Sequence, residues 1–272
     1  MLTYFSIVFL TSWGLIILLA GPSNLPIDAE KSKELLPLLY ILMLVGPSLA
    51  GLLLTGLIKG KAGLLRLKER LLMWRKGIRW YLIALSTAPI LALVMLLLLS
   101  RLSPEFNLGI FSSQEKTSFL LSGIFIGLLV GIFEEIGWSG FVVPKLRLRY
   151  NIFTTGLIVG ILWGAWHFIL FWERDSFSGT LPMLIILGRL FAWLPPFRVF
   201  MVWILDQTES LLLVIITHAS LIFTTTVLVP MTLSGKNLLS WLILWGAVLW
   251  IIVFVIAIAK GGIFTQNPVE KK

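Results

Sequence analysis

Long apolar segments dominate this sequence and limit the folds that it can adopt. An α-helix needs about 20 apolar residues to cross a hydrocarbon layer of ~30 Å, and eight segments come close to or exceed that length. They are Tyr4–Ala20, Leu36–Ile58, Trp80–Ser100, Ser118–Pro144, Ile152–Trp172, Leu181–Leu205, Ser210–Pro230 and Leu238–Ala259. Only 13% of the residues are charged, whereas a typical soluble domain has roughly 25%. The sequence therefore predicts an all-α fold, a polytopic membrane bundle of about eight transmembrane helices that forms a single domain over residues 1–272.

The basic residues indicate how these helices cross the membrane. The loop from Lys59 to Arg79 carries eight Lys and Arg residues, and the turn at 145–151 and the tail from residue 260 carry three each. Cytoplasmic loops are enriched in Lys and Arg, so alternation across eight spans places both termini in the cytoplasm. Residues 2–20 lack a basic leading segment, which favours a first membrane helix over a cleaved signal. We expect a multi-pass integral protein of a prokaryotic plasma membrane.

Composition excludes several functional classes. The net charge of +9 comes from short segments between apolar runs, which is typical of topology determinants, so no nucleic-acid partner is expected. The chain has no cysteine, which excludes thiol catalysis and disulfides.

The loop from Lys59 to Arg79 fits either an amphipathic helix on anionic lipid or a solvated linker. Pro195-Pro196 should kink or break the sixth span.

Few ionisable residues lie inside the predicted spans. They are Glu134, Glu135, His167, Arg189, Arg198 and His218. A charged group at membrane depth is unfavourable, so such residues mark functional sites by default. A single buried histidine is more often a hydrogen-bonded structural residue than a catalyst. Here, however, both histidines of the chain and an adjacent pair of acids fall within spans.

Helix arithmetic places three of these groups in one layer of the membrane. Glu134 and His167 are equally distant in sequence from the middle of the turn that joins the fourth and fifth spans. At 1.5 Å per residue, Glu134 lies about 16 Å, His167 about 22 Å and His218 about 12 Å from the cytoplasmic ends of their helices. An acid and two imidazoles are therefore expected at similar depth.

Two glycine series predict close packing of the fourth span on the fifth. They are Gly123, Gly127 and Gly131 on one helix, and Gly156, Gly160 and Gly164 on the other. Small residues at every fourth position let helix backbones approach each other. Ordinary membrane-helix packing explains these glycines without any site.

An acid beside a neutral imidazole in a dry cavity can deprotonate a water molecule. A second imidazole can stabilise the oxyanion that forms when this water attacks an amide. His and Glu are also zinc ligands, so a metal, if present, would be held by Glu134, His167 and His218. The signature His-Glu-x-x-His is absent, so the motifs do not predict zinc, and the chemistry requires no cofactor.

Motifs between Ser118 and Thr226 resemble the CPBP family of intramembrane proteases, which includes type II CAAX prenyl endopeptidases and bacterial relatives tied to bacteriocin processing or self-immunity. The motif residues are Glu134-Glu135, Trp163 four residues before His167, and His218. The resemblance implies that Glu134 is the general base and His167 its partner in activating water. It also implies that His218 is an oxyanion donor and that Glu135 supports or orients the site.

The sequence departs from the family pattern at two positions. Where the family has an arginine after the acid pair, this chain has Ser139, and Arg189 or Arg198 from the sixth span could replace it. Where the family has Asn or Asp four residues after the last histidine, this chain has Ile222, which cannot donate to an oxyanion. Thr225 lies near the same helix face and is a candidate substitute.

The resemblance implies an intramembrane endopeptidase that acts on a membrane peptide or lipidated protein, prenylated or bacteriocin-like, near the cytoplasmic side of the lipid bilayer. Two alternatives remain. Ser139 and Ile222 favour a non-catalytic membrane immunity or interaction protein on the same scaffold. Intramembrane Glu and His residues also occur in proton-coupled transporters. The oligomeric state is open.

Overall fold

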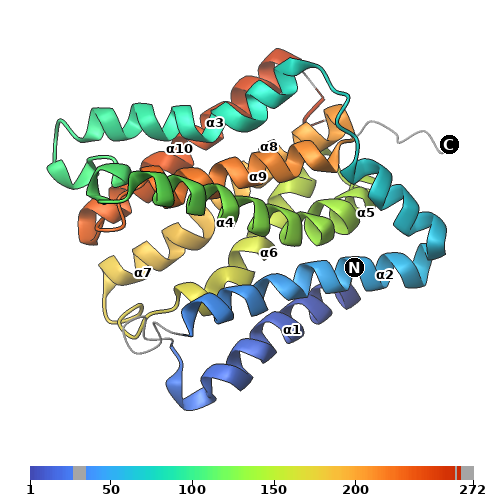
Figure 1. Ribbon diagram of the computed structural model, residues 1–272, viewed down its shortest axis with the longest axis horizontal. Helices are drawn as coiled ribbons and strands as arrows, with labels where there is room; N and C mark the ends of the chain where they lie inside the picture. The colour runs from blue at the N-terminus through green and yellow to red at the C-terminus, as the bar shows by residue number, and fades with distance from the viewer. Residues whose placement is uncertain (27–34, 261, 265–272) are drawn as a thin grey trace.

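Membrane-length helices build the protein, as the sequence predicts. The computed structural model describes residues 1–26, 35–260 and 262–264, and within these ranges it contains helices and loops but no strand (Figure 1). The α-helices are α1 (Leu2–Ala20), α2 (Leu36–Leu71), α3 (Ile78–Leu99), α4 (Lys116–Gly137), α5 (Val143–Arg147), α6 (Ile152–Phe171), α7 (Thr180–Leu187), α8 (Leu194–Thr208), α9 (Leu211–Phe223) and α10 (Gly235–Lys260).

Shorter helical segments lie between these helices or extend them. The 3₁₀ turns η1 (Pro22–Asn24), η2 (Pro104–Phe106) and η3 (Gly109–Ser112) lie in connecting loops, whereas the π-helical segments η4 (Trp138–Val142), η5 (Gly188–Ala192) and η6 (Thr224–Leu228) extend α4, α7 and α9. When α4–η4–α5, α7–η5–α8 and α9–η6 are each counted as one span, the described residues contain eight helices long and apolar enough to cross a membrane. The prediction of an all-α polytopic bundle is confirmed.

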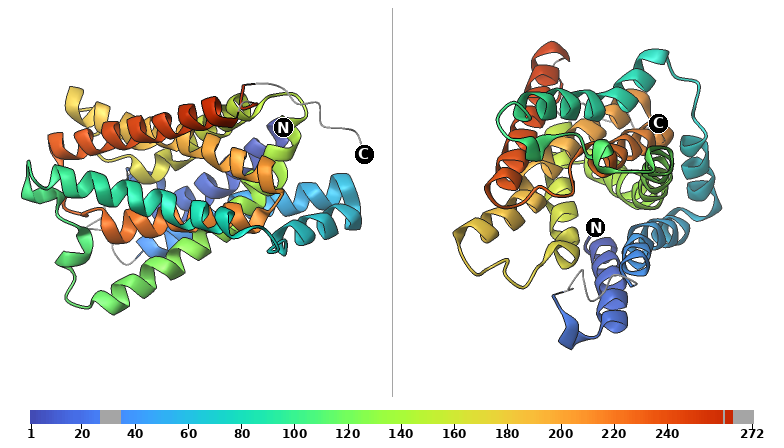
Figure 2. Two further views of the ribbon diagram at one scale, coloured as in Figure 1. Left: turned by 90° about the horizontal axis from the view of Figure 1, so that it is seen from above. Right: turned by 60° about the vertical axis from the view of Figure 1, so that its left-hand side comes forward.

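The helices pack in neighbouring pairs around α4 and α9. These two run side by side through the middle of the molecule, while α1 pairs with α2 and α6 with α8 (Figures 1 and 2). One continuous cluster of buried apolar side chains extends from Val8 on α1 to Trp245 on α10. This continuity supports the prediction of a single domain, which remains a prediction.

Both glycine series mediate close packing, but the predicted partners are wrong. A Cβ atom on Gly127 would lie 2.6 Å from the carbonyl oxygen of Ala219, so α4 approaches α9 rather than α6. On α6, a Cβ atom at Gly160 would lie 2.5 Å from the Cα of Pro195, so α6 approaches α8. Bulky aromatic side chains lie between α4 and α6, including Trp138 and Trp166, whose ring centroids are 6.0 Å apart.

The sixth predicted span is broken, as the proline pair indicates. α7 and η5 end before Trp193, and α8 begins at Leu194 with Pro195 and Pro196 in its first turn. Proline is tolerated there because the first backbone N–H groups of a helix have no intrahelical acceptor. The break starts a new helix four residues before Arg198.

The basic segment after the second span is largely helical rather than a solvated linker. α2 kinks at Gly60, whose φ is 59°, and then continues to Leu71. In this second half, Leu67 is buried against Leu211 and Ile215 of α9. Figure 1 shows that this half of α2 and the basic α5 lie toward the same end of the molecule, on the right. The assignment of this end to the cytoplasm remains a prediction.

Candidate active site

Glu135 is the centre of a buried ion-pair network. Both of its carboxylate oxygens accept hydrogen bonds from Nη1 of Arg198, at 2.9 and 2.8 Å. Its Oε1 also lies 2.8 Å from Nδ1 of His218, and its Oε2 accepts a hydrogen bond from the Ser139 hydroxyl. Glu135, Arg198 and His218 have no exposed surface. A buried carboxylate requires such compensation, because an unpaired charge away from water is strongly destabilising.

Arg198 supplies the cation that the family pattern places at position 139. This confirms one of the two predicted replacements. The other, Arg189, forms an ion pair at 2.6 Å with Glu173, where both side chains are partly exposed. Ser139 has not lost contact with the site, since its hydroxyl bonds to Glu135. Ser139 on η4, at the position of the family's arginine, and Arg198 on α8 therefore both bond to the carboxylate of Glu135.

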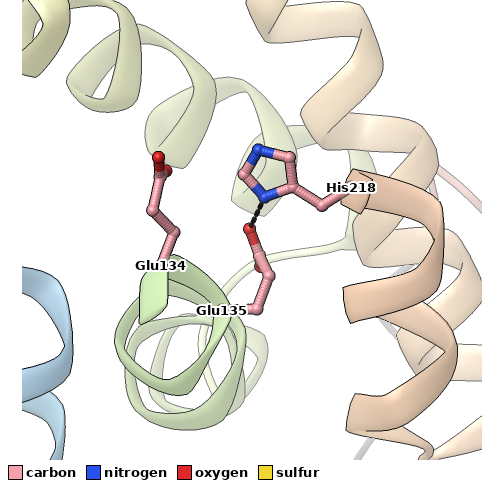
Figure 3. Close-up of side chains that lie close together, drawn as sticks. All are labelled: Glu134, Glu135 and His218. Carbon is pink, nitrogen blue, oxygen red and sulfur yellow. Dashed lines mark hydrogen bonds and ion pairs between the residues drawn. The ribbon is translucent and has the colours of Figure 1, made fainter. Parts of the chain in front are cut away.

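The same network sets the orientation of His218. An ionised carboxylate accepts hydrogen bonds but donates none, so Nδ1 of His218 carries the proton in the bond to Glu135. Figure 3 shows this contact, with Glu134 leaving α4 in a different direction from Glu135. Nε2 of His218 is buried and has no partner among the described residues. This nitrogen therefore has an unused capacity for a hydrogen bond.

Glu134 has a different environment from its neighbour. Its Oε2 accepts a hydrogen bond of 2.6 Å from the indole nitrogen of Trp163, and only 2% of the residue is exposed. Within the described part of the chain, no other side chain or backbone group bonds to the carboxylate of Glu134. The charge of Glu135 is therefore compensated by a cation, whereas Glu134 meets only a neutral donor.

His167 lies one helical turn beyond Trp163. Its Nδ1 is 2.8 Å from the backbone oxygen of Trp163, and its ring is half-buried against Trp163 and Trp166, with ring centroids 5.4 and 4.8 Å apart. Because Nδ1 donates to a carbonyl, Nε2 is the free nitrogen. The ring of His218 is also 5.2 Å from that of Trp163. Glu134, His167 and His218 thus meet around one tryptophan, in agreement with the layer expected from helix arithmetic.

The metal set suggested by the sequence differs from the cluster that the structure assembles. Ligand atoms of Glu134, Glu135 and His218 lie within 4.8 Å of one another, and His167 is not in this group. A structural or catalytic zinc site has at least three protein ligands free to bind the ion. Here Arg198 holds both oxygens of Glu135 and Trp163 holds one oxygen of Glu134. Only the other oxygen of Glu134 and Nε2 of His218 are left without a partner among the described residues, which is fewer than three ligands. This donor set does not fit a resident zinc ion.

Sequence reasoning missed several polar groups near the site. The hydroxyl of Tyr4 on α1 and the indole nitrogens of Trp138 and Trp166 are buried without partners among the described residues. Tyr4 packs edge-on against Trp138 at 5.7 Å between ring centroids. No sequence signal distinguishes Tyr4 from the other aromatic residues of the spans. The indole of Trp163 was visible in the sequence only as the aromatic position of a motif.

The proposed substitute for the missing amide donor is engaged locally. The Thr225 hydroxyl donates to the backbone oxygen of Ile222 at 3.1 Å, within its own helix. A role for Thr225 at an oxyanion remains a prediction without support from its hydrogen bond. The predicted donor role of His218, whose Nε2 has no partner among the described residues, also remains a prediction.

Comparison of the sequence with known proteins agrees with the site described above. Residues 116–224 match the family model described as type II CAAX prenyl endopeptidase Rce1-like. This part of the chain is therefore similar to the CAAX/CPBP protease family. The CAAX prenyl protease 2 of Methanococcus maripaludis is 32% identical over 148 residues, which are 50% of this chain and 55% of the relative. The chain thus covers about half the length of that curated relative. The segment matched to the CAAX protease family includes all four predicted site residues and Arg198.

Proposed function

We propose that the protein is an intramembrane endopeptidase that hydrolyses a peptide bond with a water molecule activated by Glu134. The observation that carries this proposal is the difference between the two adjacent acids. Arg198 compensates Glu135, while Glu134 keeps one oxygen without a partner among the described residues. Pairs of acids with contrasting environments commonly divide supporting and reacting roles.

The reaction follows from the free atoms around Trp163. Glu134 takes a proton from water as the water oxygen attacks the scissile carbonyl carbon, and Nε2 of His167 orients that water. The carbonyl oxygen becomes an oxyanion beside Nε2 of His218, which in its protonated form donates to it. The C–N bond then breaks, the amine leaves with the proton returned from Glu134, and a carboxylic acid remains on the other product.

Glu135 and Arg198 act as supports in this scheme. Their ion pair holds Nδ1 of His218 and thereby directs Nε2 toward the reacting carbonyl. An unpaired negative charge on Glu135 would disturb the site, but the guanidinium of Arg198 compensates it. The proposed step runs through no metal, because the donor set does not fit one.

The substrate is proposed to be a membrane-associated protein or peptide. The relative's name specifies a prenyl protease, and a C-terminal Cys-a-a-X sequence is the usual signal for prenylation of its cysteine. An S-farnesyl Cys-a-a-X peptide is therefore the first substrate to test. A membrane peptide without a lipid is the second.

Substitution of the base tests the proposal. In proteoliposomes, Glu134→Gln should abolish release of the tripeptide from a fluorogenic S-farnesyl peptide, because an amide cannot accept the proton of water. Glu105→Gln, at an exposed position outside the bundle core, should retain wild-type turnover. Circular dichroism and size-exclusion profiles should be the same for all three proteins.

Comparison of membrane peptidomes extends the test to substrates without a lipid. Cells that express the wild type should contain a cleavage product that is absent with Glu134→Gln. Unchanged turnover in Glu134→Gln on every substrate would reject the assignment of the base.

A second function is favoured by one observation. Ile222 stands where the family pattern has an amide or acid, and loss of one oxyanion donor typically lowers the rate on the order of 10²- to 10³-fold. A non-catalytic immunity or interaction protein would keep its cellular phenotype in both Glu134→Gln and His218→Ala. Loss of the phenotype in both variants favours the protease.

A further inference from the structure

Trp163 is the most connected residue of the site, although the proposed chemistry assigns it no step. The residue is 1% exposed. The indole nitrogen donates to Glu134 at 2.6 Å, and the backbone oxygen accepts from Nδ1 of His167 at 2.8 Å. The guanidinium carbon of Arg198 lies 4.1 Å from the ring centroid of Trp163.

The two hydrogen bonds act on the two groups that activate water. The bond to Oε2 of Glu134 fixes the carboxylate plane and leaves Oε1 for the water molecule. The bond to Nδ1 of His167 selects the tautomer in which Nε2 accepts a proton or a hydrogen bond. Both constraints come from one residue, so the geometry of the base and that of its partner are set together.

The ring face of Trp163 adds a third constraint. A guanidinium over an aromatic face is attracted by the ring quadrupole, more strongly where water is excluded. Arg198 therefore contacts Trp163 with its face and Glu135 with Nη1. Phenylalanine at position 163 would keep the ring face and the backbone oxygen but would lose the indole N–H.

We propose that Trp163 is a positioning residue for peptide hydrolysis, whose indole N–H orients Glu134 while its backbone oxygen orients His167. This inference rests on the proposed function, because it assigns Trp163 a role in the same water-activating step. It goes beyond packing, since it assigns a specific task to the N–H group. Because the role concerns the chemical step, we expect substrate binding not to depend on this bond.

Kinetics of matched tryptophan variants test the positioning role. Trp163→Phe should lower kcat on the order of 10- to 100-fold, as expected for loss of a hydrogen bond to a charged group, with KM nearly unchanged. Trp166→Phe is the control, because Trp166 lies on the same helix, is fully buried and contacts His167, yet its indole nitrogen has no partner among the described residues. It should retain kcat. Equal losses of kcat in both variants, or no loss in Trp163→Phe, would overturn the proposal.

Nuclear magnetic resonance of ¹⁵N-indole-labelled protein in nanodiscs tests the bond without any substrate. The indole proton signal of Trp163, assigned by its absence in Trp163→Phe, should lie downfield and move upfield in Glu134→Gln, since a neutral amide is a weaker acceptor than a carboxylate. If the chemical shift of the Trp163 indole proton is the same in Glu134→Gln as in the wild type, the proposal is contradicted. If that signal responds but the wild type cleaves no peptide, the bond stands and the proposed function fails. If the wild type cleaves and Trp163→Phe keeps its kcat, the function stands and the positioning role fails.

Discussion

Adjacent residues can carry the same chemical group and still have separate tasks. Successive side chains on a helix point about 100° apart, so Glu135 faces Arg198 and His218 while Glu134 faces Trp163 on α6. The sequence predicts an important acid pair at this position. It does not indicate which acid meets the cation, because the cation arrives from a helix 63 residues further along the chain.

Removal of Arg198 should destabilise the fold. Arg198→Leu would leave Glu135 charged and unpaired in the interior, a change that typically costs about 3–5 kcal/mol of unfolding free energy. The double variant Arg198→Leu with Glu135→Gln should recover much of this loss, because the unpaired charge is gone. Thermal unfolding in detergent measures both changes.

The exposed pair Arg189–Glu173 offers the control for this prediction. Partly exposed ion pairs contribute about 0–1 kcal/mol, so Arg189→Leu should shift the unfolding midpoint little. If the unfolding midpoints of Arg189→Leu and Arg198→Leu are comparable, the stability of the fold does not depend on the pairing of Glu135 with Arg198.

At the scale of elements, helix faces were easier to predict than helix partners. Glycine spacing correctly marks one flat face on α4 and one on α6, but it carries no information about which helix fills each face. The fourth predicted span also differs in shape, because the backbone winds as a π-helix at η4, where the N–H of Val143 donates to the oxygen of Trp138 five residues earlier. π-helical turns are frequent at functional sites, and periodicity alone does not reveal them.

The approach of α4 to α9 can be tested with a single methyl group. Gly127→Ala would place a Cβ atom 2.6 Å from the oxygen of Ala219, so the helices must separate, at about 1–3 kcal/mol. Since Ala219 follows His218, turnover should fall together with the unfolding midpoint. Both quantities are measured on the same preparation.

Gly14 on α1 is the matched control, since no atom lies within 4 Å of a Cβ atom built there. Gly14→Ala should be neutral or should raise stability by about 0.5–1 kcal/mol, because alanine favours the helix. A larger loss in Gly14→Ala than in Gly127→Ala would contradict the packing described for α4.

For the whole molecule, apolar length was sufficient to predict the eight spans, and the proline pair located the interruption of the sixth. Composition did not reveal that the basic segment after Lys59 packs through Leu67 onto α9. That contact depends on tertiary structure, because an amphipathic helix can cover either lipid or protein with its apolar face. The same limitation applies to Tyr4, whose proximity to Trp138 follows only from the docking of α1.

The absence of cysteine makes the predicted topology directly measurable. Leu72→Cys and Leu102→Cys place single thiols at exposed positions in the segments before and after α3. A membrane-impermeant maleimide should label Leu72→Cys only in inverted vesicles and Leu102→Cys only in intact spheroplasts, since basic loops remain cytoplasmic. Labelling of both thiols from the same side would reject the eight-span alternation.

The convergence of Ser139 and Arg198 on Glu135 affects how relatives should be recognised. A search pattern that demands arginine at position 139 discards this chain, even though the guanidinium–carboxylate contact is present. In an alignment, the columns that correspond to residues 139 and 198 should be read together, because a positive charge at either position could pair with Glu135. A relative that lacks arginine at the first position is therefore expected to carry a cation at the second.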